Sequence, residues 1–217
     1  MHEALQKTWD TIADSWSNLR VRPWREVLEF SKDVKKGVVL DIGCGNCRNL
    51  IPFIGNGIEC IGMDFSKGMI KQSKIFLKKR NLKANLVIGI SANLPFKNES
   101  VSTVICNAVL HDIIQKEDIS RSLKEIRRVA KNNCEVLMSV WNRCQKRFIW
   151  PLIKSFFSGN YADIWVDWNY HGKIYKRFYH LYTKKELRNE IEKVELKVEK
   201  GWNDEKGNIW LLITKWE

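Results

Sequence analysis

Two carboxylates and two glycines stand where a parallel sheet would place a ligand site. One apolar run leads into Asp41, Gly43 and Gly45. Glycine lets a backbone approach a ligand closely, and a carboxylate at a strand end can accept hydrogen bonds from a bound amine or an ordered water. A second apolar run ends at Asp64, twenty-one residues after Gly43, and Phe65 follows it as a further candidate for ligand contact. This spacing predicts a nucleoside site in which Asp64 holds both hydroxyls of a ribose.

The residues of the glycine loop distinguish a dinucleotide from other nucleoside ligands. A dinucleotide site asks for a third glycine where Arg48 stands, and it does not ask for an acid two residues before the first glycine. Asp41 would also repel a pyrophosphate. The loop therefore favours an adenosyl cofactor, with a dehydrogenase or a vestigial fold as alternatives. Cys44 and Cys47 form a CxxC pair, but no second pair or nearby histidine completes a zinc site, so no metal is expected.

Strand-length apolar runs alternate with segments of helical period, which is typical of a parallel sheet with crossover helices. The expected strands cover residues 38–43, 58–64, 85–91, 101–108, 134–141, 195–202 and 208–216. The expected helices cover residues 3–16, 23–31, 48–54, 67–80, 119–131 and 184–193. A short polar loop at 203–207 predicts a hairpin between the last two strands. We expect an α/β fold with a seven-stranded, mostly parallel sheet, helices on both faces and an antiparallel last strand.

We expect one domain over residues 1–217, with a helical cap at 1–33. Residues 142–182 break the alternation and contain all five tyrosines and two of the four histidines. A structureless loop of that length would be unusual unless it capped a site or bound a partner. This stretch is therefore expected to be an aromatic and basic insertion that forms the substrate-binding region.

The formal net charge of +12 favours a polyanionic partner, against the alternative of a lysine-rich solvated surface. Two expected helices carry much of this charge. The first has lysines along one face, and the second has a dense run of basic residues: Lys67, Lys71, Lys74 and Lys78, then Arg121, Lys124, Arg127, Arg128 and Lys131. Two such helices indicate nucleic acid.

The remaining composition points to a cytoplasmic protein. No apolar run approaches the ~18 residues that a membrane helix needs. Residues 1–9 are polar and show no secretory signal. The six cysteines lack the dense pairing of a small secreted scaffold, so reduced thiols are expected.

The glycine loop resembles that of the class I S-adenosylmethionine-dependent methyltransferases. Their motif here reads Asp41-Ile42-Gly43-Cys44-Gly45, and the resemblance covers residues 34–141. It implies a Rossmann-like fold and S-adenosylmethionine as the cofactor. It also implies cofactor contacts from residues at the ends of the third and fourth strands: Ser91, Ala92 and Asn107. Two positions depart from the family, since Cys47 replaces a third glycine and Ser91 replaces an acid that often binds the adenine amine.

Four further segments are similar to the tRNA methyltransferases that esterify 5-carboxymethyluridine at the wobble position. They lie in order along the chain at residues 18–24, 108–112, 140–145 and 177–182. Three departures accompany them, because Arg25 replaces a proline, Asp112 replaces the second histidine of a pair, and 165–168 reads Trp-Val-Asp-Trp where the family has Phe-Val-Pro-Trp.

That resemblance implies roles for five residues. Arg20 and Arg177 would grip the acceptor carboxylate or neighbouring phosphates, since a guanidinium suits bidentate recognition. His111 would orient the acceptor oxygen, and Tyr179 and His180 would stack on or hydrogen-bond to the splayed base. Other readings are a structural His111, a Tyr179 buried in the insertion, and an Arg20 that caps a helix. No strong base is required, because a carboxylate is already ionised at neutral pH.

The same resemblance implies two partners, the anticodon loop of a tRNA and a small zinc-binding activator subunit that pairs along a sheet edge. Two other functions stay open. One is a methyltransferase for a small metabolite, which would not explain the basic helices. The other is a non-catalytic RNA-binding module that has kept the fold.

Overall fold

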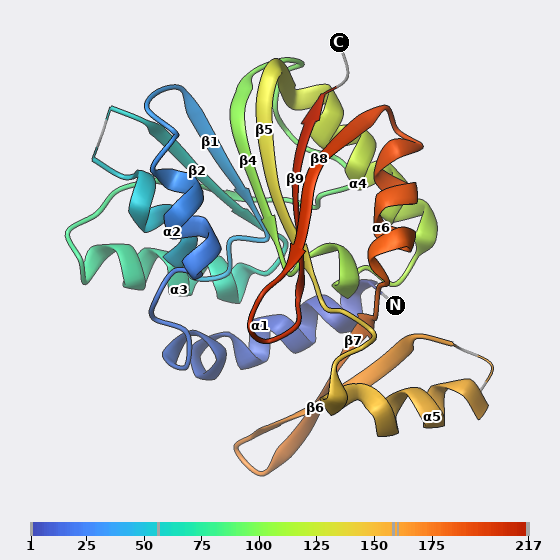
Figure 1. The fold of residues 1–217 in the computed structure, drawn as a ribbon. Coiled ribbons are helices and arrows are strands. Elements are labelled where there is room, and N and C mark those ends of the chain that lie inside the picture. The colour runs from blue at the N-terminus through green and yellow to red at the C-terminus, as the bar shows by residue number, and fades with distance from the viewer. Residues whose placement is uncertain (1, 56, 158, 160, 216–217) are drawn as a thin grey trace.

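The computed structural model describes residues 2–55, 57–157, 159 and 161–215. Seven strands form one sheet in the order β3-β2-β1-β4-β5-β9-β8 (Figure 1). Their bounds are β1 Val38–Ile42, β2 Glu59–Asp64, β3 Asn85–Ile88, β4 Val101–Asn107, β5 Ala130–Val140, β8 Leu196–Asn203 and β9 Ile209–Lys215. Neighbours are parallel except where β9 lies antiparallel between β5 and β8. The expected α/β fold and its antiparallel last strand are confirmed.

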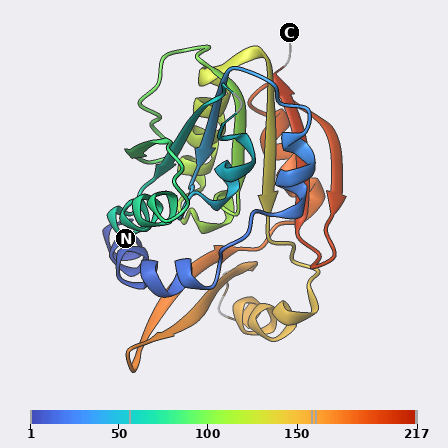
Figure 2. The same ribbon diagram turned by 90° about the vertical axis from the view of Figure 1, so that its left-hand side faces the viewer.

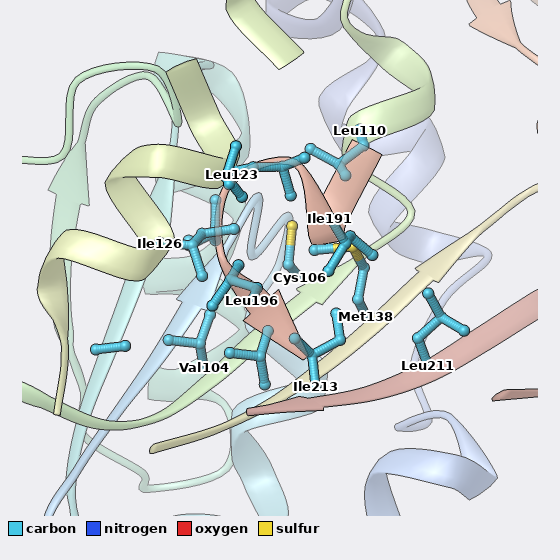
Figure 3. Packing of buried hydrophobic residues seen from close by; sticks show 14 of the residues in the cluster. Val104, Cys106, Leu110, Leu123, Ile126, Met138, Ile191, Leu196, Leu211 and Ile213 are labelled. Atoms are coloured by element: carbon cyan, nitrogen blue, oxygen red, sulfur yellow. The ribbon is translucent and has the colours of Figure 1, made fainter. Parts of the chain in front are cut away.

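Helices cover both faces of this sheet (Figure 2). The described helices are α1 His2–Asn18, α2 Arg25–Ser31, α3 Lys67–Lys78, α4 Lys116–Val129, α5 Ile149–Phe157 and α6 Lys184–Glu192, with 3-10 turns η1 Arg48–Phe53, η2 Leu110–Asp112 and η3 Lys146–Phe148; α5 lies away from the sheet. In β4, Val104 and Cys106 face α4 and α6, whereas Ile105 faces the opposite layer. Figure 3 shows Leu123 of α4 and Ile191 of α6 in the same cluster as Cys106. Burial on both faces explains why the central strands are mostly apolar runs, whereas the edge strand β8 alternates exposed Lys197 and Glu199 with buried Leu196 and Val198.

The element boundaries differ from expectation at several places. The expected helix at 48–54 is a 3-10 turn that starts after Cys47, whose φ of 64° is left-handed, and that contains Pro52. Proline lacks an N–H donor, so a regular helix is disfavoured there. The third strand stops at Ile88, and β5 begins at Ala130, which is four residues early. Residue 216, the expected end of the last strand, lies outside the described residues.

Residues 142–182 contain η3, α5 and a hairpin of β6 Asp163–Tyr170 with β7 Lys173–His180. His171 and Gly172 join the two strands with φ of 48° and 70°, as a tight turn of the primed type requires. The hairpin packs against α1, and α1 packs in turn on α3 (Figures 1 and 2). Among the described helices, none combines the length and apolar character needed to cross a membrane.

Candidate active site

A pocket opens where β1, β2 and β4 end at the same edge of the sheet. It encloses about 1110 Å³ of empty space, part of it open to solvent. The strands and their loops supply one wall, with Gly43, Gly45, Asp64 and Asn107. Bare glycine backbone beside a few polar side chains suits a nucleoside ligand.

Helix α1 forms the cover of the pocket. Its side chains Leu5, Trp9 and Trp16 line the cavity. The helix is fixed by Asp10, whose Oδ1 accepts hydrogen bonds from Ser66 Oγ at 2.6 Å and from the backbone N–H of Gly68 at 2.8 Å. The expected N-terminal helices therefore contribute directly to the site.

The glycine loop is strained in a way that only glycine tolerates. Gly43 and Gly45 have φ of 66° and 56°, in the left-handed region. A Cβ on Gly43 would lie 2.4 Å from Val109 Cγ2, and one on Gly45 would lie 2.8 Å from the ring of Trp16. Both expected glycines therefore line the pocket with bare backbone.

Asp64 stands at the end of β2 and is 5% exposed. Its Oδ2 accepts a hydrogen bond from the N–H of Gly45 and its Oδ1 accepts one from Ser66, both at 2.9 Å. Burial raises the pKa of Asp64 and the backbone hydrogen bonds lower it, and burial dominates, so that the pKa is about 6. Each carboxylate oxygen keeps a second lone pair, so the group can still accept from a ribose hydroxyl. Phe65 follows it on the pocket wall.

Asp41, expected at the cofactor, lies behind the loop and does not line the pocket. It is 1% exposed, and burial raises its pKa well above the usual range, helped by the nearby Asp64. Its Oδ2 has no hydrogen-bond partner. The side chain is therefore a buried carboxyl beneath the glycine loop, in surroundings that favour its protonated form.

Ser91, Ala92 and Asn107 all line the pocket, as expected. Ser91 Oγ lies 2.8 Å from Ser122 Oγ in a hydrogen bond between the two hydroxyls. Both polar atoms of the Asn107 side chain are buried without a partner. An unsatisfied buried amide is costly, so Asn107 fits the wall of a site that a polar ligand completes. Together with Asp64 and the glycines, this donor set fits an adenosyl cofactor.

His111 is 1% exposed and lies behind the pocket wall. Its Nδ1 accepts the backbone N–H of Trp141 at 3.1 Å, which leaves the proton on Nε2. Burial, with Arg147 nearby, lowers the pKa of His111 to about 3, so the ring is neutral. Nε2 lies 3.3 Å from Asp112 Oδ1, without the geometry of a hydrogen bond. His111 therefore reaches the pocket only through Asp112, which lines it.

Two arginines converge beside this wall. The guanidinium of Arg177 lies 4.7 Å from the ring of Trp168, and that of Arg20 lies 5.6 Å from the same ring and 4.5 Å from Trp16. Arg177 is 5% exposed and its Nε has no partner. Burial lowers the pKa of Arg20, and the charge of Arg177 lowers it further. This is a concentrated, partly unsatisfied positive charge of the kind that binds an anion.

Tyr179 and His180 hold the insertion in place. Tyr179 is 2% exposed and stacks at 4.1 Å on Trp141, so its faces are covered. His180 Nδ1 lies 2.5 Å from Asp163 and its Nε2 lies 3.0 Å from Glu186. Both ring nitrogens are thus engaged within the chain. Neither side chain presents a free edge to a base in this arrangement.

Three functional positions were missed from the sequence. Trp9 and Trp16 line the pocket, and their separation by seven residues on one helix face was the available signal. Arg48 also lines it and lies 5.3 Å from the ring of Trp24. The sequence pattern identifies Arg48 only as the residue in place of a third glycine.

The basic side chains of the two helices differ in whether they form ion pairs within the chain. The four lysines of α3 point into solvent. In α4, Arg127 pairs with Glu195 and Arg128 with Glu125, each at 2.7 Å, and Arg121 pairs with Asp118. Helix α3 is therefore the stronger candidate for contact with a polyanion.

Comparison with known proteins agrees with this geometry. A family profile described as a methyltransferase domain matches residues 40–138. A candidate methyltransferase of Encephalitozoon cuniculi is 30% identical over 185 residues, covering 82% of this chain and 80% of the relative. A tRNA (carboxymethyluridine(34)-5-O)-methyltransferase of Arabidopsis thaliana is 29% identical over 165 residues, covering 75% of this chain and 38% of its own length. This chain thus spans less than half of the plant relative.

The fold also recurs among solved structures. In the complex between the Haloferax volcanii Trm112 methyltransferase activator and a methyltransferase, one chain superposes with a TM-score of 0.74 at 16% identity, covering 98% of both chains. The family profile, the relative at 30% identity and the adenosyl pocket agree. The chain belongs to the class I S-adenosylmethionine-dependent methyltransferases.

Proposed function

We propose that this methyltransferase acts on tRNA and esterifies the carboxylate of 5-carboxymethyluridine at the wobble position. The observation that carries the proposal is the pair of guanidiniums of Arg20 and Arg177, which both lie against the ring of Trp168. A planar cation with an unsatisfied Nε, buried beside a cofactor pocket, suits a planar anionic acceptor. The similarity to the plant tRNA methyltransferase supports the same substrate.

The cofactor would be held by the pocket wall. Asp64 accepts the ribose hydroxyls, Phe65 packs beside them, and Asn107 supplies a donor and an acceptor to the amino-acid part. Ser91 and Ala92 flank the adenine, and Gly43 and Gly45 leave room for the ligand; all of these side chains and glycines line the pocket. Asp41 supports the loop from beneath.

Positioning dominates the chemistry. When bound, S-adenosylmethionine supplies an electrophilic methyl group on a sulfonium. The acceptor carboxylate would receive that methyl group, and because a carboxylate is already ionised at neutral pH, no proton would have to be removed. Arg20 and Arg177 hold the carboxylate in line, and the neutral His111 lies beside Asp112 behind the pocket wall. Residues 142–182 act as the substrate-binding region, with Tyr179 and His180 setting the position of Arg177 in β7.

Transfer of labelled methyl from S-adenosylmethionine to tRNA lacking the wobble ester tests this function. We expect an alkali-labile label on the wobble uridine after nucleoside analysis. Label on another nucleoside, or transfer only to a metabolite extract, would reject the tRNA assignment and keep the methyltransferase.

A small activator subunit is proposed as a partner at the β3 edge of the sheet. Ile88 and Ile90 are 51% and 53% exposed there. An uncovered apolar edge strand is a template for pairing with another chain. Co-expression with a zinc-binding activator should raise the yield of unaggregated protein, whereas a stable and fully active isolated chain would remove the partner.

A further inference from the structure

Helix α5 has an apolar side chain on nearly every face. Phe148 and Leu152 pack inward against the hairpin, and Ser155 on the same face is buried. Outward, Trp150 is 74% exposed and Phe157 is 83% exposed. A helix that is apolar all round is normally covered on all sides, so this outer face requires a partner.

Four rings make up what we term the α5 aromatic surface: Trp150, Phe156, Phe157 and Tyr161. Phe156 lies edge-on to both neighbours, 5.8 Å from Phe157 and 6.2 Å from Tyr161. Residues 142–162 include four basic side chains and no acidic one. A ring cluster on a segment with a net positive charge is complementary to a polyanion that also carries flat faces.

The α5 aromatic surface follows in sequence a segment that lies beside the proposed active site. Arg147, in η3 directly before α5, lies 4.5 Å from the ring of Trp141. Trp141 stacks on Tyr179 at 4.1 Å, and both contact the ring of His111. His111 in turn lies beside Asp112 on the pocket wall. Ring contacts thus connect η3, at the base of α5, with the wall of the pocket.

We propose that the α5 aromatic surface stacks the unpaired bases that flank the methylated nucleotide in a single-stranded RNA loop. This inference rests on the proposed tRNA function and adds a recognition surface to it. Bases of any identity can stack on an aromatic ring, so the surface would fix the position of the loop without reading its sequence. Arg147 and Lys154, at the border, would meet the phosphates.

Binding of an anticodon stem-loop RNA by Trp150→Leu and Trp150→Phe separates stacking from simple apolar contact. Leucine keeps the apolar volume without a ring, whereas phenylalanine keeps the ring. We expect Trp150→Leu to weaken the RNA dissociation constant by about fivefold or more, and Trp150→Phe by less than about twofold. A fluorescence anisotropy titration measures both without requiring methyl transfer.

Leu28→Ala on α2 serves as the matched control, since Leu28 is also exposed, at 43%, but lies outside the surface. Its RNA affinity and the affinity of all variants for S-adenosylhomocysteine should stay at the wild-type value. Unchanged RNA affinity in Trp150→Leu would overturn the inference, whether or not self-association changes. An equal loss on fully paired RNA would also overturn it. A wild-type chain that binds the loop but transfers no methyl rejects only the proposed reaction.

Discussion

The raised pKa of Asp64 predicts how cofactor affinity depends on pH. The carboxylate must be ionised to accept two ribose hydroxyls, yet burial raises its pKa to about 6. Protonation would turn one oxygen into a donor and remove an acceptor. The affinity for S-adenosylhomocysteine should therefore fall as pH drops through 6, at pH values where an ordinary aspartate is still ionised.

The magnitude follows from the ionised fraction. With a pKa of about 6, roughly nine-tenths of the Asp64 side chains are ionised at pH 7 and about one-tenth at pH 5. The apparent dissociation constant scales inversely with the competent fraction, so it should rise about tenfold from pH 7 to pH 5. Between pH 7 and pH 8 it should be nearly constant.

Calorimetric titration with S-adenosylhomocysteine at pH 5, 6, 7 and 8 measures this profile. Asp64→Asn is the control, because an amide of the same shape does not titrate. That variant should bind more weakly at every pH, with a flat profile. A wild-type profile that is flat down to pH 5, or a variant that keeps the tenfold change, would refute the role given to Asp64.

Four further outcomes are expected. Burial raises the pKa of Asp41 well above normal, so this side chain lowers the stability of the fold as the pH rises above the pKa of Asp41 in the unfolded chain. Thermal scans of Asp41→Asn should therefore show a raised melting temperature at pH 8 and little change at pH 4. Arg177→Ala should lower turnover on tRNA by about 30-fold or more with unchanged S-adenosylhomocysteine affinity, and Arg177→Lys should recover only part of it. Gly68→Ala would place a Cβ 2.5 Å from the carbonyl oxygen of Asp10, so calorimetry should show weakened cofactor binding as α1 is displaced. Leu123→Ala in the α4 core should cost about 2 to 5 kcal/mol in urea unfolding.

The sheet could be predicted because its strands carry their own signal. Runs buried on both faces are apolar without interruption, and Gly43 and Asp64 mark the strand ends where ligands bind. The predicted ends of helices and strands were wrong where the chemistry of individual residues competes with the hydrophobic periodicity. Pro52 disfavours a regular helix at 48–54, and β5 takes over at Ala130 directly after α4 ends.

The part of the site that would bind the methyl acceptor was harder to predict, because it depends on contacts between segments that are distant in the sequence. In the sequence, His111 follows an apolar run and His180 follows Phe178 and Tyr179, and neither pattern shows what the imidazole contacts. Only the fold reveals that His180 is engaged by Asp163 and Glu186, while His111 lies beside Asp112. Periodicity likewise identifies α1 as a helix but cannot tell what its tryptophans cover.

The attachment of α1 also has a consequence for the order in which the protein matures. Trp168 donates from Nε1 to Ser15 at 2.9 Å, and Tyr170 donates to Asp14 at 2.7 Å, across 153 and 156 residues of sequence. Helix α1 therefore gains these anchors only after the hairpin has been synthesised. A nascent chain that ends before β6 has the glycine loop but an incompletely anchored cover. Tight retention of the nucleoside by a nascent chain would thus report that the hairpin has been translated and folded.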